Sequence, residues 1–254
     1  MSPRVLFLVS VIAAAVGGAL WLAVSGLPGG EGATRPSSLE ERVRRYLIAH
    51  PEVLNEAADA FQRRRQREET AARVKVMTEL KGALRANGGL PVMGNPKGDV
   101  TVVEFFDYRC PYCKQAFAEL QRLVAQDKNL RLVFREFPIL GPQSLLASRA
   151  AIAAREQGKY LEMHVALMAH GGALDESTVM EIAKAQGVDT ARLRADMEKP
   201  QVMTMIKESL ALAGRLGVEA TPTLIIGDEV YAGYAEIAVL KDLVARARAS
   251  CKSC

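Results

Sequence analysis

The pattern of apolar and polar residues begins with a long apolar segment. Residues 5–27 contain no charged side chain, and a helix of that length reaches roughly 34 Å, enough to cross a bilayer. Residues 28–37 are rich in glycine and proline and predict a linker. The segment predicts an uncleaved membrane anchor, with a cleaved signal peptide as the alternative, and either one exports the rest of the chain.

Residues 38–90 are strongly charged and have a helical pattern. Ser38 and Glu41 form a capping box, and Pro51 suits the first turn of a second helix. Apolar residues recur at helical spacing in two groups, namely Leu54, Ala58 and Phe61, and then Met77, Leu80 and Leu84. Because this stripe is narrow and interrupted, the helix cannot fold alone. We expect an oligomerisation stalk; the alternative is a helix packed along its own domain.

Residues 91–250 predict an α/β domain. A β-branched and aromatic run predicts a buried strand at residues 100–106, and further strands are predicted at residues 130–136, 223–226 and 229–232. A helical pattern between the first two strands predicts a parallel pair with a crossover helix, and Gly227-Asp228 predicts a hairpin between the last two. Residues 142–216 are helical in pattern and predict an inserted helical domain.

Composition excludes several classes of protein. The 254 residues are 49% hydrophobic and 24% charged, unlike disordered, collagen-like or disulfide-dense chains. The formal net charge of +4 comes from 33 basic and 29 acidic residues, so no overall field favours nucleic acid as a partner. The four cysteines fall into two pairs, one at Cys110 and Cys113 and one in the tail, residues 251–254.

The first cysteine pair lies between a predicted buried strand and a helix. At the helix start, unpaired N–H groups and the helix dipole favour a thiolate at Cys110. Cys113 is then placed to resolve a mixed disulfide, and Pro111 is harmless in the first turn. The alternatives are a structural disulfide and half of a zinc site. The three histidines show no ligand spacing, and we predict neither a metal nor a cofactor.

A second signal is Thr221-Pro222, directly before a predicted strand. An X-Pro bond adopts the cis form at modest cost, and proline donates no ladder hydrogen bond. A cis loop facing Cys110 would present the backbone of Thr221 to an extended substrate. The alternative is an ordinary trans proline; with the cysteine pair upstream, we expect the cis form.

Two segments carry a family resemblance. Residues 102–113 (VVEFFDYRCPYC) resemble the active-site segment of DsbA-type thioredoxin-fold proteins, and residues 217–223 (GVEATPT) resemble their cis-proline segment. Residues 46–54 and 94–100 resemble the ScsC/Com1-like branch, whose N-terminal extension forms dimers or trimers. The resemblance implies a thioredoxin fold with an inserted helical domain, preceded by a helical stalk and a membrane anchor or signal segment.

The resemblance also implies roles for individual residues. Cys110 would be the nucleophile and Cys113 the resolving thiol. Glu104 matches a buried acid thought to help proton transfer to the cysteines; the alternative is a satisfied carboxylate at a strand end. The substrate-docking surface would be formed by Thr221, Pro222, Pro111 and Tyr112.

The expected function is therefore that of a periplasmic thiol–disulfide oxidoreductase, tethered by residues 5–27 or released after cleavage. Tyr112, where the strongest oxidants have histidine, and Thr221 before the proline favour a disulfide isomerase. The alternatives are a dithiol oxidase and a copper-binding protein, since thiolates select Cu(I). Expected partners are exported proteins with cysteines, a membrane redox partner and further copies of the chain, in a trimer or dimer. The tail pair, Cys251 and Cys254, could also be an exposed disulfide or a relay.

Overall fold

The computed structural model describes residues 38–86, 89 and 91–250. The predicted anchor or signal segment, the linker at residues 28–37 and the tail cysteines lie outside the described residues. Within them, none of the helices combines the length and the apolar character that a membrane crossing requires. The chain divides between residues 65 and 66 into two units, and each is described by itself.

The N-terminal unit contains helix α2 (Leu39–Ala49) and the first part of helix α3 (Glu52–Arg85). Helix α2 begins after Ser38, whose hydroxyl accepts a hydrogen bond from the N–H of Glu41 at 3.2 Å. Several large apolar side chains of this unit are exposed, namely Leu39, Val43, Tyr46, Ile48, Leu54 and Phe61. The first group of the predicted stripe, which includes Leu54 and Phe61, is therefore uncovered, and exposed apolar side chains of α2 add to it.

The second unit begins within α3, and in this part of the helix the apolar stripe is buried. Met77, Leu80 and Leu84 are buried and belong to a core cluster with Val103 and Phe105 of the sheet. This second group therefore packs against the chain's own domain, which is the alternative stated from the sequence. Burial against the sheet also supplies the tertiary contacts that a charged helix needs.

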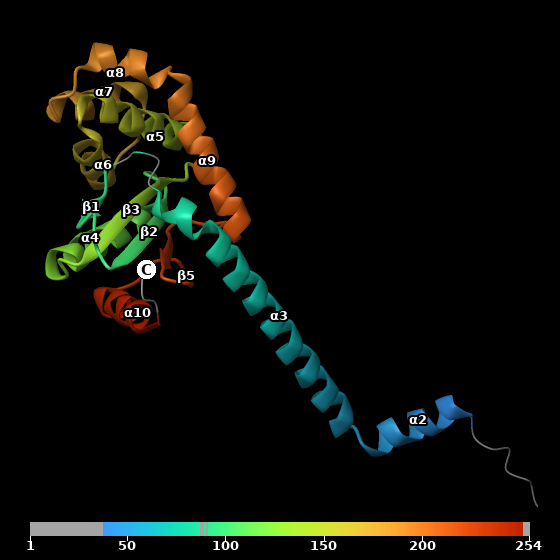
Figure 1. The fold of residues 1–254 in the computed structure, drawn as a ribbon. Helices are drawn as coiled ribbons and strands as arrows, with labels where there is room; N and C mark the ends of the chain where they lie inside the picture. Colours follow the sequence, from blue (N-terminus) through green and yellow to red (C-terminus); the bar gives the residue numbers. More distant parts are fainter. Residues whose placement is uncertain (1–37, 87–88, 90, 251–254) are drawn as a thin grey trace, which may run out of the picture. The chain divides into compact units, whose positions relative to one another are not determined.

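A five-stranded sheet forms the centre of the second unit, in the order β1-β3-β2-β4-β5 (Figure 1). Strand β2 pairs in parallel with β3, and the other neighbours are antiparallel, which confirms the predicted crossover and hairpin. The short strand β1 was not predicted, because two residues carry no alternating pattern. The strands are β1 (Met93–Gly94), β2 (Val100–Phe106), β3 (Leu130–Glu136), β4 (Thr223–Ile226) and β5 (Glu229–Ala232).

Helices cover both faces of this sheet. One face packs against α4 and α10, and the other against α9 and the end of α3. Between β3 and β4 the chain forms the inserted helical domain, which lies beside one end of the sheet (Figure 1). The helices are α4 (Pro111–Gln126), α5 (Pro142–Ala154), the short 3₁₀ helix η1 (Arg155–Gln157), α6 (Tyr160–Ala169), α7 (Glu176–Ala185), α8 (Thr190–Met197), α9 (Pro200–Leu216) and α10 (Ile237–Ser250).

Candidate functional site

The loop between β2 and α4 is fixed by one buried carboxylate. Asp107 accepts a hydrogen bond from the N–H of Arg109 at 2.8 Å through Oδ1. Its Oδ2 accepts two more, from the N–H groups of Ile139 and Leu140, both at 2.9 Å. Asp107 therefore links two segments: the one that leads to Cys110, and the loop that follows β3.

Cys110 is the N-cap residue of α4, and Pro111 directly after it begins the helix. The Thr221–Pro222 peptide bond is cis, as expected from the sequence. The Cys110 thiol donates a hydrogen bond to the carbonyl oxygen of Thr221, with the two atoms 3.3 Å apart. The two sequence signals, more than a hundred residues apart in the chain, thus meet at one point.

The two cysteines are free thiols with different electrostatics. Hydrogen bonds from the side chains of Cys113 and Thr221, and from backbone N–H groups at the helix start, lower the pKa of Cys110 to about 5 against the opposing effect of burial. Burial instead raises the pKa of the Cys113 thiol far above its ordinary value. At neutral pH the arrangement therefore favours a thiolate at Cys110 and a thiol at Cys113.

Glu104 lies in the middle of β2, and its side chain is fully buried. Neither carboxylate oxygen has a hydrogen-bond partner among the described residues, so the alternative of a satisfied carboxylate does not hold. Burial, together with the negative charge of Cys110, raises the pKa of Glu104 to about 8. The carboxyl group is therefore mostly protonated at neutral pH and close enough to the cysteines to respond to their charge.

Sequence reasoning missed Lys114, which follows the second cysteine. Its ammonium group donates hydrogen bonds to the carbonyl oxygens at the end of α6, those of Leu167, Met168 and His170, at 3.1, 3.3 and 2.7 Å. Burial lowers the pKa of Lys114, while the cysteines and Asp107 act in the opposite direction. The available signal was a lysine in the first turn of a helix, a position that the helix dipole disfavours for a cation.

A buried polar cluster behind the loop was also missed. Tyr108 and Tyr160 both donate to Oε1 of Glu136 at 3.0 Å, and the Tyr108 oxygen lies 2.9 Å from Nδ1 of His164. Since Tyr108 donates to the glutamate, His164 is the donor to Tyr108. Burial raises the pKa of Glu136 to about 8 and lowers that of His164 to about 3. The signal in the sequence was a glutamate at the end of a predicted strand.

Exposed apolar side chains surround the cysteine pair. Tyr112 is 61% exposed, and Ile139 and Leu140 are 40% and 43% exposed. The Arg109 guanidinium donates to the carbonyl oxygen of Leu140 at 2.9 Å, so this loop is attached to the segment before Cys110. Within the described part of the chain, His, Cys, Asp and Glu side chains form no group of three or more that could hold a metal ion.

A dithiol at the start of a helix, opposite a cis-proline loop at the end of a thioredoxin-like sheet, defines the class of thiol–disulfide exchange proteins. Residues 101–245 match the family model described as DSBA-like thioredoxin domain, and the chain belongs to this family. Residues 37–68 match a second model, the N-terminal domain of the copper resistance protein ScsC. The resemblance stated from the sequence is thereby confirmed.

Solved structures agree with this assignment. A thioredoxin-like oxidoreductase from Silicibacter pomeroyi is 51% identical, with a TM-score of 0.64 over 66% of this chain and 97% of that one. The thiol-disulfide exchange protein alpha-DsbA2 from Wolbachia pipientis is 29% identical, with a TM-score of 0.64 over 70% and 97%. BcfH from Salmonella enterica Typhimurium is 28% identical, with a TM-score of 0.66 over 84% and 96%.

The curated relatives are longer proteins, and the match covers only a small share of their length. The Na(+)/H(+) antiporter NhaA 1 of Salinispora arenicola is 33% identical over 158 residues, which are 61% of this chain and 24% of that protein. The chain thus spans about a quarter of this relative. The match identifies a shared domain and does not carry the antiporter activity over to this chain.

Proposed function

We propose that the chain is a periplasmic disulfide isomerase that acts on exported proteins through Cys110 and Cys113. The Cys110 sulfur carries the proposal, because its pKa lies near 5 and it lies 3.3 Å from the carbonyl oxygen of Thr221. A thiolate is the attacking form of cysteine, so the site supplies a nucleophile at neutral pH. Tyr112 and Thr221 add support, since both favour an isomerase within the resembling family.

The proposed reaction begins when the Cys110 thiolate attacks one sulfur of a substrate disulfide. The substrate S–S bond breaks, a mixed disulfide forms, and the other substrate sulfur leaves as a thiolate. A substrate thiolate then attacks the mixed disulfide, forms a new substrate disulfide and releases Cys110 as a thiolate. No net electrons are transferred. If this step fails, Cys113 attacks Cys110, which releases a reduced substrate and leaves the pair oxidised, and a membrane reductant then restores it.

Glu104 is proposed to handle the proton of Cys113. Burial is the larger cause of the raised pKa of Glu104, and while Cys110 is a thiolate its charge raises this pKa further. Formation of the mixed disulfide removes that charge, so the pKa of the buried carboxyl group falls, and its proton can pass to the substrate thiolate that leaves. The resulting carboxylate can then accept the proton of Cys113 as this thiol attacks Cys110. The same exchange in reverse returns a proton to Cys113 when the pair is reduced.

Substrate binding is proposed to use the surface around the sulfur. The Thr221 backbone before Pro222 would pair with an extended substrate segment, as an added strand does at a sheet edge. Apolar side chains of an incompletely folded substrate would contact Tyr112, Ile139 and Leu140, which are exposed beside the site. Such a surface accepts many sequences, because backbone pairing and apolar contact are weakly selective.

We also propose that copies of the chain associate through the N-terminal unit. Six large apolar side chains there are exposed, which is an interaction signal, and residues 37–68 match the ScsC N-terminal domain. Changing Leu54 and Phe61 together to Asp should convert a trimer or dimer into a monomer in light scattering. The same change at Val239 and Leu210, exposed residues of the second unit, should leave the mass unchanged.

A dithiol oxidase is the second candidate, favoured by one observation. Stabilising the Cys110 thiolate stabilises the reduced pair, and this makes the corresponding disulfide more oxidising. Thiol trapping in intact cells separates the two functions, because an isomerase keeps Cys110 and Cys113 reduced and an oxidase keeps them as a disulfide. A fully oxidised resting state would therefore reject the isomerase assignment.

A matched pair of variants tests the chemistry itself. Cys110→Ser should abolish the rearrangement of a scrambled disulfide substrate, whereas Cys113→Ala should retain part of it, because isomerisation needs only the nucleophile. Introduction of disulfides into a reduced substrate should be lost in both variants. Activity that survives Cys110→Ser would rule out the proposed mechanism for either function.

A further inference from the structure

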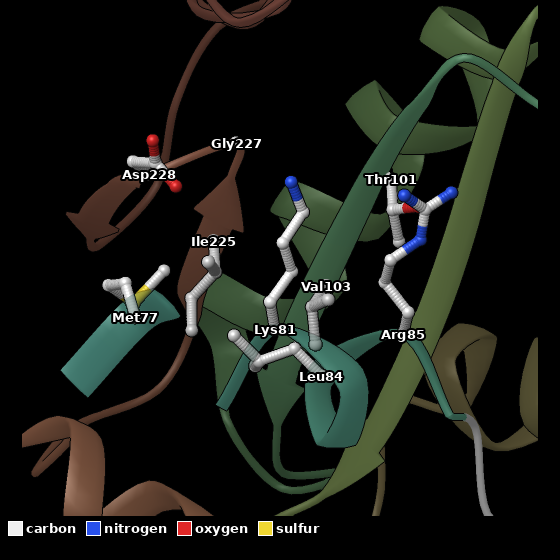
Figure 2. Close-up of a pocket in the computed structure, with 9 residues that line it drawn as sticks. All are labelled: Met77, Lys81, Leu84, Arg85, Thr101, Val103, Ile225, Gly227 and Asp228. Atoms are coloured by element: carbon white, nitrogen blue, oxygen red, sulfur yellow. The ribbon is translucent and has the colours of Figure 1, made fainter. Parts of the chain in front are cut away.

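A pocket lies on the face of the sheet opposite the cysteines, and the redox chemistry does not use it. It is lined by the last turns of α3, by strands β2 and β4, and by the turn between β4 and β5 (Figure 2). Its apolar lining consists of Met77, Leu84, Val103 and Ile225. Its polar side chains are those of Lys81, Arg85, Thr101 and Asp228.

Thr101 is the residue that points to a ligand. Its side chain is only 4% exposed, and its hydroxyl group has no hydrogen-bond partner in the part of the chain that the structure describes. Buried hydroxyl groups in folded proteins nearly always have a partner. Because Thr101 lines the pocket, a group bound there is in a position to supply one.

A second unpartnered donor lies next to Thr101 in the sheet. Arg131 of β3 pairs with Thr101 of β2 in the parallel register, so both side chains project from the same face. The Nη1 atom of Arg131 is buried and has no hydrogen-bond partner among the described residues. A hydroxyl group and a guanidinium nitrogen on neighbouring strands thus lack partners within the described ranges, at the same end of the sheet.

Positive charge is concentrated around these two donors. Arg85 lies close enough to Arg131 to lower its pKa, in addition to the larger effect of burial. Arg135, four residues further along β3, is already used, since its guanidinium donates to the carbonyl oxygens of Ala83 and Ala86 at the end of α3. Two like charges held together, next to donors without acceptors, favour the binding of an anion.

We propose that this pocket binds a small oxyanion with the chemistry of a phosphate group. Thr101, Arg85 and Arg131 would donate to it, and Lys81 would add charge. A guanidinium donates to two phosphate oxygens in parallel, and donors from a helix and two strands approach from different directions, which suits a tetrahedral anion. Asp228, the carboxylate among the lining residues, stands on the β4–β5 turn, on the opposite side of the view from Thr101 and Arg85 (Figure 2).

Calorimetric titration of the full chain with inorganic phosphate, at constant ionic strength set with sodium chloride, tests the proposal. Binding should saturate, and Thr101→Val and Arg131→Gln should each weaken it at least tenfold. Lys241→Gln, which removes one exposed charge from α10, should leave it unchanged. A parallel titration with glycerol 3-phosphate distinguishes the source: binding of both ligands assigns a phosphate ester, and binding of inorganic phosphate alone assigns the free anion.

Thr101→Val also controls for folding. Valine replaces an unpartnered hydroxyl with a methyl group of similar size, so without phosphate this variant should unfold at the same temperature as the wild type or higher. Weaker phosphate binding in a variant of unchanged stability would support the site. No saturable binding of phosphate, or equal binding in Thr101→Val, Arg131→Gln and Lys241→Gln, would overturn it. Neither result depends on the thiol–disulfide activity.

Discussion

The ammonium nitrogen of Lys114 lies 2.7 Å from the carbonyl oxygen of His170, so the helix that carries the cysteines is attached to the end of α6. Two more carbonyl groups of the same helix end accept hydrogen bonds from this lysine. A cation at a helix C-terminus interacts favourably with the helix dipole and satisfies carbonyls that lack a partner within the helix. The inserted helical domain and the redox site are thereby connected through one side chain.

Lys114→Met should destabilise the protein by about 2 kcal/mol, since hydrogen bonds from a charged group are lost at a half-buried position. Lys114→Arg should restore part of this stability. Urea unfolding measures both, with Lys128→Met on the exposed surface as the control. Reaction of Cys110 with iodoacetamide should also shift to higher pH in Lys114→Met, because a nearby positive charge is gone. If Lys128→Met lowers stability equally, the contacts with α6 are not the cause.

The pH dependence of Cys110 alkylation should have its midpoint near pH 5. The side chain of Cys113 makes the largest contribution to lowering this pKa, so Cys113→Ala should raise the midpoint, and Cys113→Ser, which keeps a donor, should raise it less. Mass spectrometry of the alkylated peptide gives the rates. A midpoint near pH 8.5 in the wild type, the value of an unperturbed cysteine, would contradict the stabilised thiolate.

Glu104→Gln should increase stability at alkaline pH more than at acid pH. The folded-state pKa of Glu104 is raised from 4.5 to about 8, so the folded state holds this proton more tightly than the unfolded chain does. This tighter proton binding contributes to the free energy of unfolding. The contribution is complete below pH 4.5 and is lost as the pH rises to about 8. Denaturant unfolding across this range should show a smaller decline for Glu104→Gln than for the wild type.

The same variant tests the proton-transfer proposal kinetically. Glu104→Gln should slow the attack of Cys113 on a preformed mixed disulfide, because the carboxylate that accepts the proton is absent. Formation of that mixed disulfide at Cys110 should be much less affected. Equal rates for Cys113 attack in variant and wild type would exclude the assigned role while leaving the prediction on stability intact.

Tyr108→Phe should lower the free energy of unfolding by about 1–3 kcal/mol, because Glu136 and His164 each lose a buried hydrogen bond. Tyr234→Phe, at a less buried tyrosine, is the control and should change stability by less than about 0.5 kcal/mol. Thermal unfolding of the two variants measures both losses of stability. An equally small effect at Tyr108 would show that the buried cluster does not contribute to stability.

Replacing Ile139 and Leu140 together with Ser should raise KM for an unfolded protein substrate several-fold. The reaction with glutathione disulfide, which is too small to cover this loop, should be unchanged. Val239→Ser on α10 serves as the control for lost exposed apolar surface. A similar loss of activity with both substrates would indicate damage to the site. Unchanged activity with both would show that the loop does not contribute to substrate binding.

The sequence predicted the sheet well, because its longer strands are runs rich in β-branched, aromatic and leucine side chains. It also predicted the meeting of Cys110 with Thr221, since both segments have distinctive neighbours. It could not place Met77, Leu80 and Leu84, because an apolar helical stripe looks the same whether it meets another copy or its own sheet. The contact of Lys114 with α6 could not be predicted either, because it depends on how segments distant in the sequence pack together.

Asp107 binds the loop after β3 only through backbone N–H groups, and this has an evolutionary consequence. The side chains at positions 139 and 140 are not needed to hold that loop in place. Under the proposed substrate contacts, substitutions there would alter which substrates are recognised while the nucleophile keeps its environment. Client preference and catalytic chemistry can therefore diversify separately among descendants of this sequence.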